Sequence, residues 1–525
     1  MKSKYLLILT LGVIPQILSA CSKNDDEISG GNSKTSEAKC YYVDSRMGND
    51  YYTGLSHLSP FKTLAKVEEL SLNPGDTVLF ARGSVFKETL KISVSGEEGK
   101  VVLFDAYGNG PKPKIEAPDN SLYGIHIYNS SYLTVRNLDI KNYGKVAKQN
   151  RCGLKIEAFD YGVSRNITIQ SLDIHDVNGL LKKSQGPGSG IAIYNNKWEE
   201  KPSVFDNLLI EHCYIARCDR NGIMWYGASK RTSDWYLSTN NVVRYNLIEE
   251  VPGDGIVPIG CTGTVIEYNR MKKSPGTLPA GDSAAGMWPW SCDDTVIRFN
   301  EVSDMMTCWD GQGFDSDDNC NNTVIEYNYS HDNGGGFLLV CSSGEWLTNP
   351  NNMGCVGTKI RYNISINDGY RDLKVKDGKA FSPTIHVAGP ARDTYINNNV
   401  FYIAEKPSGD LDRCVIHLNS WKNEAPDGNY FNDNFIYAKE KTAFRFEDVD
   451  EESSTFKNNY VVGEIDGAPE KSLIKVDAST LDEAFRNGNY ESLMDSRDVA
   501  DGRAKVRFPS PEKIAAFFSK IQSAD

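Results

Sequence analysis

Long helical patterns are scarce in this chain of 525 residues, and beyond the N-terminus no apolar run approaches the ~20 residues that a membrane-spanning helix needs. Neither a CxxC spacing nor a pair of closely spaced histidines occurs, which argues against a zinc site. The net charge is −13 and no basic patch interrupts it, so nucleic acid is not an expected partner. The whole chain is 40% apolar and contains 45 glycines and 27 tyrosines. This composition is typical of a turn-rich all-β protein.

The N-terminus carries an export pattern. Residues 1–21 read MKSKYLLILTLGVIPQILSAC, which is two lysines, an apolar run and then LSAC. The ending resembles the lipobox of bacterial lipoproteins, and the resemblance implies that Cys21 is lipidated after cleavage; an ordinary signal cut near Ala20 is the alternative. Residues 22–39 are polar and Gly/Ser-rich and predict a flexible tether. We therefore expect a monomeric exported lipoprotein at the outer membrane, on its periplasmic or cell-surface side, with Cys21 as its membrane anchor.

A short strand pattern recurs along the chain. TVIEYN stands at 264–269 and again at 323–328, and related copies are NVVRYN at 241–246, TVIRFN at 295–300, TKIRYN at 358–363 and TYINNN at 394–399. From Asn246 to Asn459, successive closing asparagines are 23, 31, 28, 35, 36, 35 and 25 residues apart. A constant strand at irregular spacing predicts stacked coils joined by loops of variable length. Asn at this place tolerates left-handed backbone and can bond to the Asn of the next coil.

Two further marks share this repeat. A glycine followed by an apolar residue lies between the asparagines, so each coil carries at least two strands; the glycines are Gly153, Gly190, Gly222, Gly255, Gly286, Gly313 and Gly336. Four cysteines each stand eight residues before the Asn of their coil, namely Cys261, Cys292, Cys320 and Cys355. Equivalent positions in stacked coils lie about 4.8 Å apart. We therefore expect a ladder of buried thiols at these four positions, although twelve cysteines in an exported chain would usually suggest disulfides.

This arrangement resembles the right-handed parallel β-helix of the pectate-lyase-like superfamily. The resemblance implies an all-β, single-stranded right-handed parallel β-helix over residues 40–465 with a short N-terminal capping helix near 61–71, followed by PGDTVLF as the first strand. Residues 466–525 form a C-terminal extension in which SPEKIAAFFSKIQ at 510–522 predicts a helix, with Ser510 as N-cap and Pro511 at its first position. We expect this helix to cap the other end of the coils.

Acidic residues gather at one strand of the repeat, in WDGQGFDSDD at 309–318. Alignment of the coils on the Gly-apolar mark places Phe314 inward and Asp315 and Asp317 outward, two apart and about 6.7 Å from each other along the strand. The same outward positions hold Trp288 and Trp290 in the preceding coil. Exposed tryptophans beside carboxylates are typical of a sugar site, since pyranose rings stack on indole and carboxylates serve as acid and base.

The leading interpretation is therefore a glycoside hydrolase acting on a polysaccharide or oligosaccharide without a cofactor. Asp315 and Asp317 are the predicted acid and base, and the residues expected to assist from the neighbouring loops are Asp310, His331 and Glu345. The predicted glycan-binding residues are Trp288, Trp290, Trp309, Tyr226 and Asp254. DSDD at 315–318 resembles the paired aspartates of polygalacturonases, but their GHG and RIK motifs are absent. Asp318 and Asp310 have a simpler alternative role, which is to bond local backbone in a turn.

Two other functions stay open at this point. A polysaccharide lyase of the same fold would hold Ca²⁺ with Asp315, Asp317 and Asp318 and use a basic residue to abstract a proton, for which the candidates are Lys272, Lys273 and Arg298. The RxPxxR signature of pectate lyases is missing from the chain. A surface protein that binds glycan without cleaving it, or forms a stalk, is the third possibility.

Overall fold

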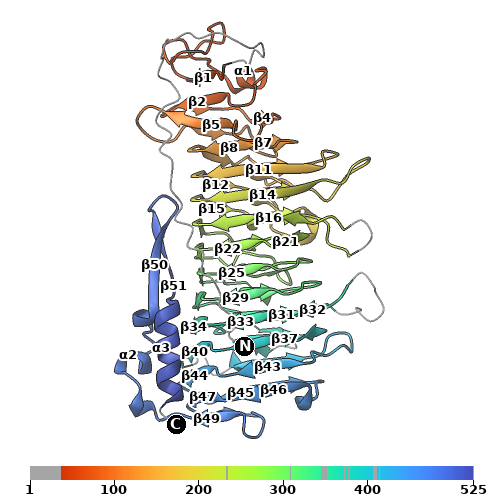
Figure 1. Ribbon diagram of the computed structural model, residues 1–525, viewed down its shortest axis with the longest axis vertical. Coiled ribbons are helices and arrows are strands. Elements are labelled where there is room, and N and C mark those ends of the chain that lie inside the picture. The colour runs from red at the N-terminus through yellow and green to blue at the C-terminus, as the bar shows by residue number, and fades with distance from the viewer. Residues whose placement is uncertain are drawn as a thin grey trace, which may run out of the picture. The chain divides into compact units, whose positions relative to one another are not determined.

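Three faces of stacked parallel strands run the length of the repeat region (Figure 1). The computed structural model describes residues 37–231, 235–307, 309–343, 352–371, 374–376, 379–405, 411–412 and 414–523. Each strand pairs in parallel with its counterpart in the next coil, which is the arrangement of a parallel β-helix. The expected all-β architecture is confirmed. None of the helices in the described ranges is long and apolar enough to cross a membrane.

The first sheet contains the repeated TVIEYN-type strands. Its main path runs through β1 (Cys40–Val43), β2 (Thr77–Ala81), β5 (Val102–Tyr107), β8 (Leu133–Arg136), β11 (Val163–Gln170), β14 (Val204–Glu211), β18 (Val242–Arg244), β22 (Val265–Glu267), β25 (Val296–Arg298), β29 (Val324–Glu326), β33 (Lys359–Arg361), β39 (Tyr395–Asn397), β43 (Asn429–Asn432) and β46 (Ser454–Lys457). Two short strands, β17 (Ser238–Thr239) and β21 (Cys261–Thr262), pair beside this path.

The second sheet follows directly after the closing asparagines. Its strands are β3 (Val85–Phe86), β6 (Lys114–Glu116), β9 (Asp139–Asn142), β12 (Asp173–Val177), β15 (Tyr214–Cys218), β19 (Leu247–Glu249), β23 (Arg270–Lys272), β26 (Glu301–Ser303), β30 (Tyr329–His331), β34 (Ile364–Ile366), β40 (Val400–Ile403), β44 (Phe435–Ala438), β47 (Asn459–Val462) and β49 (Leu473–Lys475). The last of these extends the coils ten residues beyond the predicted boundary at 465.

The third face carries the strands with the Gly-apolar mark, in two groups. The first group is β4 (Leu90–Ile92), β7 (Ile125–Tyr128), β10 (Cys152–Glu157), β13 (Ser189–Tyr194), β16 (Asn221–Tyr226) and β20 (Ile256–Val257). The second is β28 (Gln312–Ser316), β31 (Gly336–Cys341), β37 (Ile385–Ala388), β42 (Ile416–Asn419), β45 (Thr442–Glu447) and β48 (Ile465–Asp466). Single bridges from Met287 to Ile256 and to Phe314 join the two groups into one continuous face.

Short strands also pair within the loops between these sheets. They are β24 (Ser283–Ala284) with β27 (Trp309–Asp310), β32 (Cys355–Val356) with β38 (Ala391–Arg392), and the set β35 (Lys374–Lys376), β36 (Lys379–Phe381) and β41 (Leu411–Asp412).

A ladder of buried asparagines locks the coils in register. Each side chain from Asn246 to Asn434 donates from Nδ2 to Oδ1 of the Asn in the next coil, for example from Asn300 to Asn328 at 3.0 Å and from Asn328 to Asn363 at 3.0 Å. The predicted Asn-to-Asn bonding is confirmed. The left-handed backbone, however, lies at the residue before each Asn, as at Tyr268 with a φ of 54° and Phe299 with 57°. The side-chain ladder therefore fixes the Asn, and the residue before it makes the turn, an aromatic residue up to Tyr362 and Asn or Asp in the later coils.

The cysteine ladder is also confirmed. Cys261, Cys292, Cys320 and Cys355 are free thiols with no solvent exposure, and Cys261 N–H approaches the sulfur of Cys292 at 3.4 Å. The bridges from Thr262 to Asp293 and from Asp293 to Asn321 keep the coils in step here, so the four side chains stack in one column. Burial in the apolar interior raises the pKa of Cys261, Cys320 and Cys355, which holds these three thiols protonated.

The two ends of the chain differ in how far they follow the prediction. Helix α1 (Leu64–Glu68) begins at Thr63, whose side chain accepts from the Lys66 amide, and it lies beside the first coils (Figure 1). The first strand is β1, which pairs with β2 at PGDTVLF and so precedes it. Helix α3 (Pro511–Gln522) forms over the predicted residues, with short helix α2 (Glu483–Arg486) before it.

The predicted place of the C-terminal helix is wrong. Ile514, Phe517 and Phe518 of α3 belong to one apolar cluster with Val400 and Phe435 of the second sheet. The antiparallel hairpin of β50 (Met494–Val499) and β51 (Ala504–Pro509) lies along the same flank (Figure 1). Because the outer side of this sheet is itself apolar, the extension covers the flank of the coils and not their end.

Candidate active site

The acidic residues lie on the outer side of the third face. In β28 Phe314 is fully buried among core residues, and Asp315 alternates to the opposite side of the strand. The N–H of Asp317 bonds to the carbonyl of Pro289, which sets Asp317 beside Trp290 of the preceding coil. On the following coil the register places Leu339 beside Asp315, and Cys341 lies beside Asp317.

This group is more enclosed than the sequence predicts. Asp315 and Trp288 each retain only 3% exposure, whereas Asp317 and Trp290 are partly exposed and Trp309 is 38% exposed. The reason is that loop residues from other coils close over the strand. The Lys183 ammonium lies 4.9 Å from the centre of the Trp288 ring. Trp288 is thus buried, and of the three tryptophans predicted to bind glycan only Trp290 and Trp309 reach the surface.

A buried ion pair between Arg220 and Asp254 holds the indole of Trp288 in place. The indole N–H of Trp288 donates to Asp254 at 3.1 Å, and Asp254 also accepts from the guanidinium of Arg220 at 3.3 Å. Arg220 has no solvent exposure and Asp254 has 1%. Asp254, predicted to bind glycan, therefore orients Trp288 and does not face the solvent.

The carboxylates are crowded together. One oxygen of Asp315, one oxygen of Asp317 and the sulfur of Cys341 lie within 4.8 Å of one another, closer than the spacing along a strand suggests. Oδ1 of Asp317 accepts from the Asp318 amide at 2.6 Å and from the Cys341 thiol at 3.2 Å. Oδ1 of Asp315 is buried and has no hydrogen-bond partner among the described residues.

Burial and mutual repulsion shift the protonation of these groups. Burial, followed by the charges of Asp317 and Asp310, raises the pKa of Asp315 well above its usual range. Burial and the charge of Asp318 raise the pKa of Asp317 to about 7. Burial likewise raises the pKa of Asp310, against the opposing charge of Lys183. Since carboxylates this close cannot all ionise, the cluster holds at least one proton at neutral pH.

Hydrogen bonds from Arg371 fix the loop that carries Asp310. It ends β27 with a left-handed φ of 55°, and its carbonyl accepts from the guanidinium of Arg371 at 2.8 Å. The same guanidinium donates to the carbonyl of Thr307 at 2.7 Å. A side chain at Gly335 would overlap the carbonyl oxygen of Asp310, so glycine is required there. These contacts together fix the backbone at Asp310.

Asp318 bonds to the next coil. Its Oδ1 accepts from the Ser342 hydroxyl at 2.7 Å and from the amide of Ser343. It therefore joins the turn after β28 to the end of β31, whereas the alternative reading predicted bonds to local backbone.

Several predicted residues do not join the cluster. His331 lies in β30 of the second sheet, where it contacts Glu301 and Arg507, so its predicted place beside the acids is wrong. The candidate bases of a lyase are equally misplaced. Lys272 and Lys273 pair with Glu249, and Arg298 lies on the first sheet. Glu345 and Cys21 lie outside the described residues.

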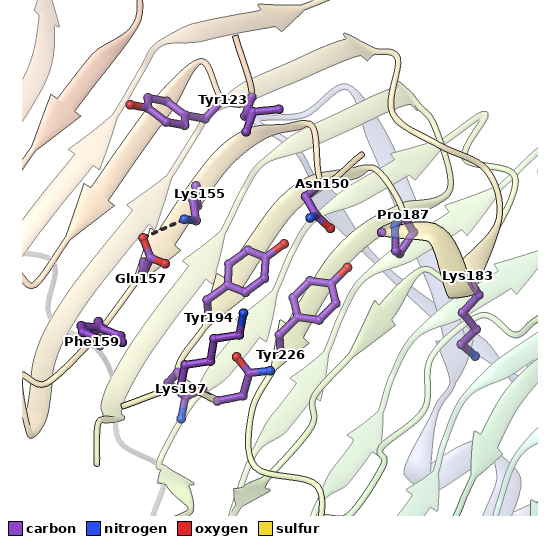
Figure 2. Close-up of a pocket in the computed structure, with 15 residues that line it drawn as sticks. Tyr123, Asn150, Lys155, Glu157, Phe159, Lys183, Pro187, Tyr194, Lys197 and Tyr226 are labelled. Carbon is purple, nitrogen blue, oxygen red and sulfur yellow. Dashed lines mark hydrogen bonds and ion pairs between the residues drawn. The ribbon is translucent and has the colours of Figure 1, made fainter. Parts of the chain in front are cut away.

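A pocket of about 520 Å³ opens on the same face, several coils before the acids (Figure 2). The rings of Tyr194 and Tyr226 stack in it with centroids 4.5 Å apart, and Lys155 pairs with Glu157 at 2.7 Å. Although burial opposes it, hydrogen bonds from His126 and Lys155 lower the pKa of Glu157 to about 2.

Of these pocket residues the sequence analysis identified only Tyr226. A signal for two others was available, because Lys155 and Glu157 follow Gly153 at the offsets at which Asp315 and Asp317 follow Gly313.

Comparison with known proteins agrees with this architecture. Residues 123–286 match the family described as the right handed beta helix region. A lacto-N-biosidase of Bifidobacterium longum is 27% identical over 492 residues, which cover 76% of this chain and 29% of that protein. The chain thus spans less than a third of the length of this curated relative.

Two solved structures of a lacto-N-biosidase of family GH136 from Eubacterium ramulus are also similar. They have TM-scores of 0.59 and 0.58 and sequence identities of 27% and 28%, and each comparison covers 77% of this chain and 68% of the other. The handedness that the sequence predicts is that of the matching family, and the chain has the fold of a right-handed parallel β-helix.

Proposed function

We propose that this protein is a glycoside hydrolase that cleaves an oligosaccharide at the acidic cluster of the third face. The observation that carries the proposal is the pair of crowded carboxylates, Asp315 and Asp317, with raised pKa values beside Trp290. Displaced pKa values within one group of carboxylates are the usual sign of separate acid and base roles. The likeness to lacto-N-biosidases supports the same reaction class.

The three aspartates of the cluster differ in solvent exposure, and this difference separates their proposed roles. Asp310 and Asp317 are partly exposed, and Asp315 lies beneath with 3% exposure. We therefore assign the two groups that touch the glycosidic bond to Asp310 and Asp317, which revises the predicted pair of Asp315 and Asp317. Asp315 is a positioning residue, with one carboxyl oxygen within 4.8 Å of an oxygen of Asp317.

The hydrogen bonds of each group decide which is acid and which is base. The Asp318 amide and the Cys341 thiol both donate to Asp317, and such donors favour its ionised form. Asp317 is then the carboxylate that attacks the anomeric carbon or activates a water. Asp310, whose pKa is raised by burial, is then the group that donates a proton to the leaving oxygen.

The substrate class to test first comes from the relatives. A lacto-N-biose-containing tetrasaccharide, incubated with the wild-type protein, should give a new reducing end for each bond cleaved, with one atom of solvent oxygen incorporated. A lyase would instead give the ultraviolet absorbance of an unsaturated uronide from an acidic polysaccharide and lose activity with a chelator. No cleavage across a panel of neutral and acidic glycans, with binding retained, would favour the non-catalytic glycan-binding function.

The lyase alternative has less support in the geometry. Calcium prefers six to eight oxygen ligands, and the third group beside Asp315 and Asp317 is the Cys341 thiol. The candidate bases lie on other sheets. We therefore propose a reaction that needs no cofactor.

We also propose that the protein is exported and held at the outer membrane by lipid on Cys21. The lysines, apolar run and LSAC of residues 1–21 support this proposal. Cells fed a labelled fatty acid should incorporate the label into the wild-type protein and not into Cys21→Ala, which should be found in the soluble fraction. Equal labelling of both proteins would contradict it.

A further inference from the structure

The pocket before the acidic cluster has an unusual charge for this protein. Three lysines line it, namely Lys155, Lys183 and Lys197, with one carboxylate, Glu157. The chain as a whole carries a net charge of −13. A recess with an excess of cations in an acidic protein favours an anionic ligand.

The three ammonium groups differ in their anionic surroundings. Lys155 is neutralised by Glu157 at 2.7 Å. The charge of Lys183 acts on the acidic cluster, whereas within the described ranges Lys197 forms no ion pair with a carboxylate. Lys197 is exposed at the Tyr194 side of the pocket, whereas Lys183 stands at the opposite end from Lys155 and Glu157 (Figure 2).

The pocket also offers the other parts of a sugar-binding surface. The stacked rings of Tyr194 and Tyr226 form its floor, with Asn150 and Asn195 beside them. Because the two rings stack on each other and the Lys155 ammonium lies over the Tyr194 ring, the pocket offers a sugar the edges of the rings and the amide groups, which are suited to its hydroxyls.

The register relates the pocket to the acids. Tyr226, Ile259, Trp290 and Asp317 occupy successive equivalent positions on the third face. Three steps of about 4.8 Å place Tyr226 roughly 14 Å from Asp317. A glycan lying along the face therefore reaches the pocket with a ring that is not the one cleaved.

We infer that this pocket is a subsite for a sugar bearing an anionic group, a carboxylate or a sulfate ester, on a ring at least one residue away from the cleaved bond. The inference deepens the proposed function and rests on it for the direction of the glycan. An anion nearer to the cleaved bond would be repelled by the ionised carboxylate of Asp317, so the separation of the two sites is part of the recognition.

The test measures binding separately from hydrolysis. The Asp317→Asn variant, which keeps the fold, is titrated with a lacto-N-biose-containing tetrasaccharide in three forms: neutral, carrying a carboxylated sugar, and carrying a sulfate ester. We expect at least one anionic form to bind about tenfold more tightly than the neutral form. We also expect 0.5 M NaCl to reduce this preference, because salt screens exposed charge. Preference for only one of the two anionic forms identifies the substituent.

Lysine variants then locate the effect. Lys197→Gln should lower the preference by roughly fivefold, as removal of one partly exposed ion pair does, and leave binding of the neutral form unchanged. Lys197→Arg should retain most of it. Lys182→Gln is the matched control, since Lys182 is exposed nearby but does not line the pocket.

Two results would overturn the inference: equal binding of all three forms, or equal losses in the Lys197→Gln and Lys182→Gln proteins. Failure of the proposed function has a different signature. In that case wild-type protein would hydrolyse none of the three forms while the preference for an anionic form remained.

Discussion

Asp317→Asn should lower kcat/KM for the cleaved oligosaccharide by at least about 100-fold, because general acid–base catalysis contributes roughly 10²–10⁴-fold. The substitution keeps the shape of the side chain and removes the group whose pKa lies near 7. Glycan binding should survive, since stacking on Trp290 does not need the carboxylate. Initial rates and calorimetric titration of the same two proteins measure both quantities.

The neighbouring aspartates supply the controls. Asp310→Asn should be as damaging as Asp317→Asn, because the bond cleaved needs a proton donor. Asp318→Asn should lose less than about tenfold, since Asp318 bonds to Ser342 and touches no substrate. An inactive Asp315→Asn protein together with a fully active Asp310→Asn protein would reject our assignment and restore Asp315 and Asp317 as the reacting pair.

Glu301→Gln should lower the free energy of unfolding by about 3–5 kcal/mol, which is the usual effect of leaving buried charges without their partner. Glu301 has no solvent exposure and accepts from Arg507 at 2.6 Å, from Arg270 at 3.1 Å and from His331 at 3.3 Å. Arg507 belongs to the C-terminal hairpin, so this contact fastens the extension to the second sheet. Urea unfolding followed by circular dichroism gives the difference.

Glu491→Gln is the matched control for that variant. Glu491 pairs with the same guanidinium at 2.6 Å but is 53% exposed, so its loss should cost less than about 1 kcal/mol. Equal destabilisation by the two variants would show that the buried position of Glu301 is unimportant.

The same cluster gives wild-type stability a defined pH range. Despite burial, hydrogen bonds from His331 and Arg507 lower the pKa of Glu301 to about 2, so its contribution is complete above about pH 4.5 and is lost as the pH falls towards 2. Against burial, bonds to Asp332 and Glu301 raise the pKa of His331 to about 9; its contribution is complete below about pH 6.5 and is lost as the pH rises through 9. In Glu301→Gln the acid limb should flatten.

Local repetition explains why the coils could be predicted from sequence and the site only in part. The Asn and Cys marks report contacts between equivalent positions, and those contacts are made wherever the mark occurs. The predicted position of His331 was wrong, although the repeat could have corrected it. His331 follows a closing Asn, and the residues after each closing Asn enter the second sheet. The flank packing of α3 depends on Phe517 meeting Phe435, a contact that no periodicity announces.

The enclosure of the acids has no sequence signal of this kind. Lys183, which contacts the Trp288 ring, belongs to a loop over a hundred residues earlier in the chain. Arg371, which donates to the Asp310 carbonyl, belongs to a later loop. Such contacts between loops of different lengths have no repeat to reveal them. The pKa shifts that distinguish Asp310, Asp315 and Asp317 follow from this enclosure and were therefore equally hidden.

The asparagine ladder has a consequence for how such proteins diversify. Neighbouring rungs stay within hydrogen-bond distance while the chain between them varies from 23 to 36 residues. Length changes in a loop are therefore absorbed outside the ladder and do not shift the strands above or below. Selection can therefore change the loops of one coil at a time while the stacked strands keep their fold.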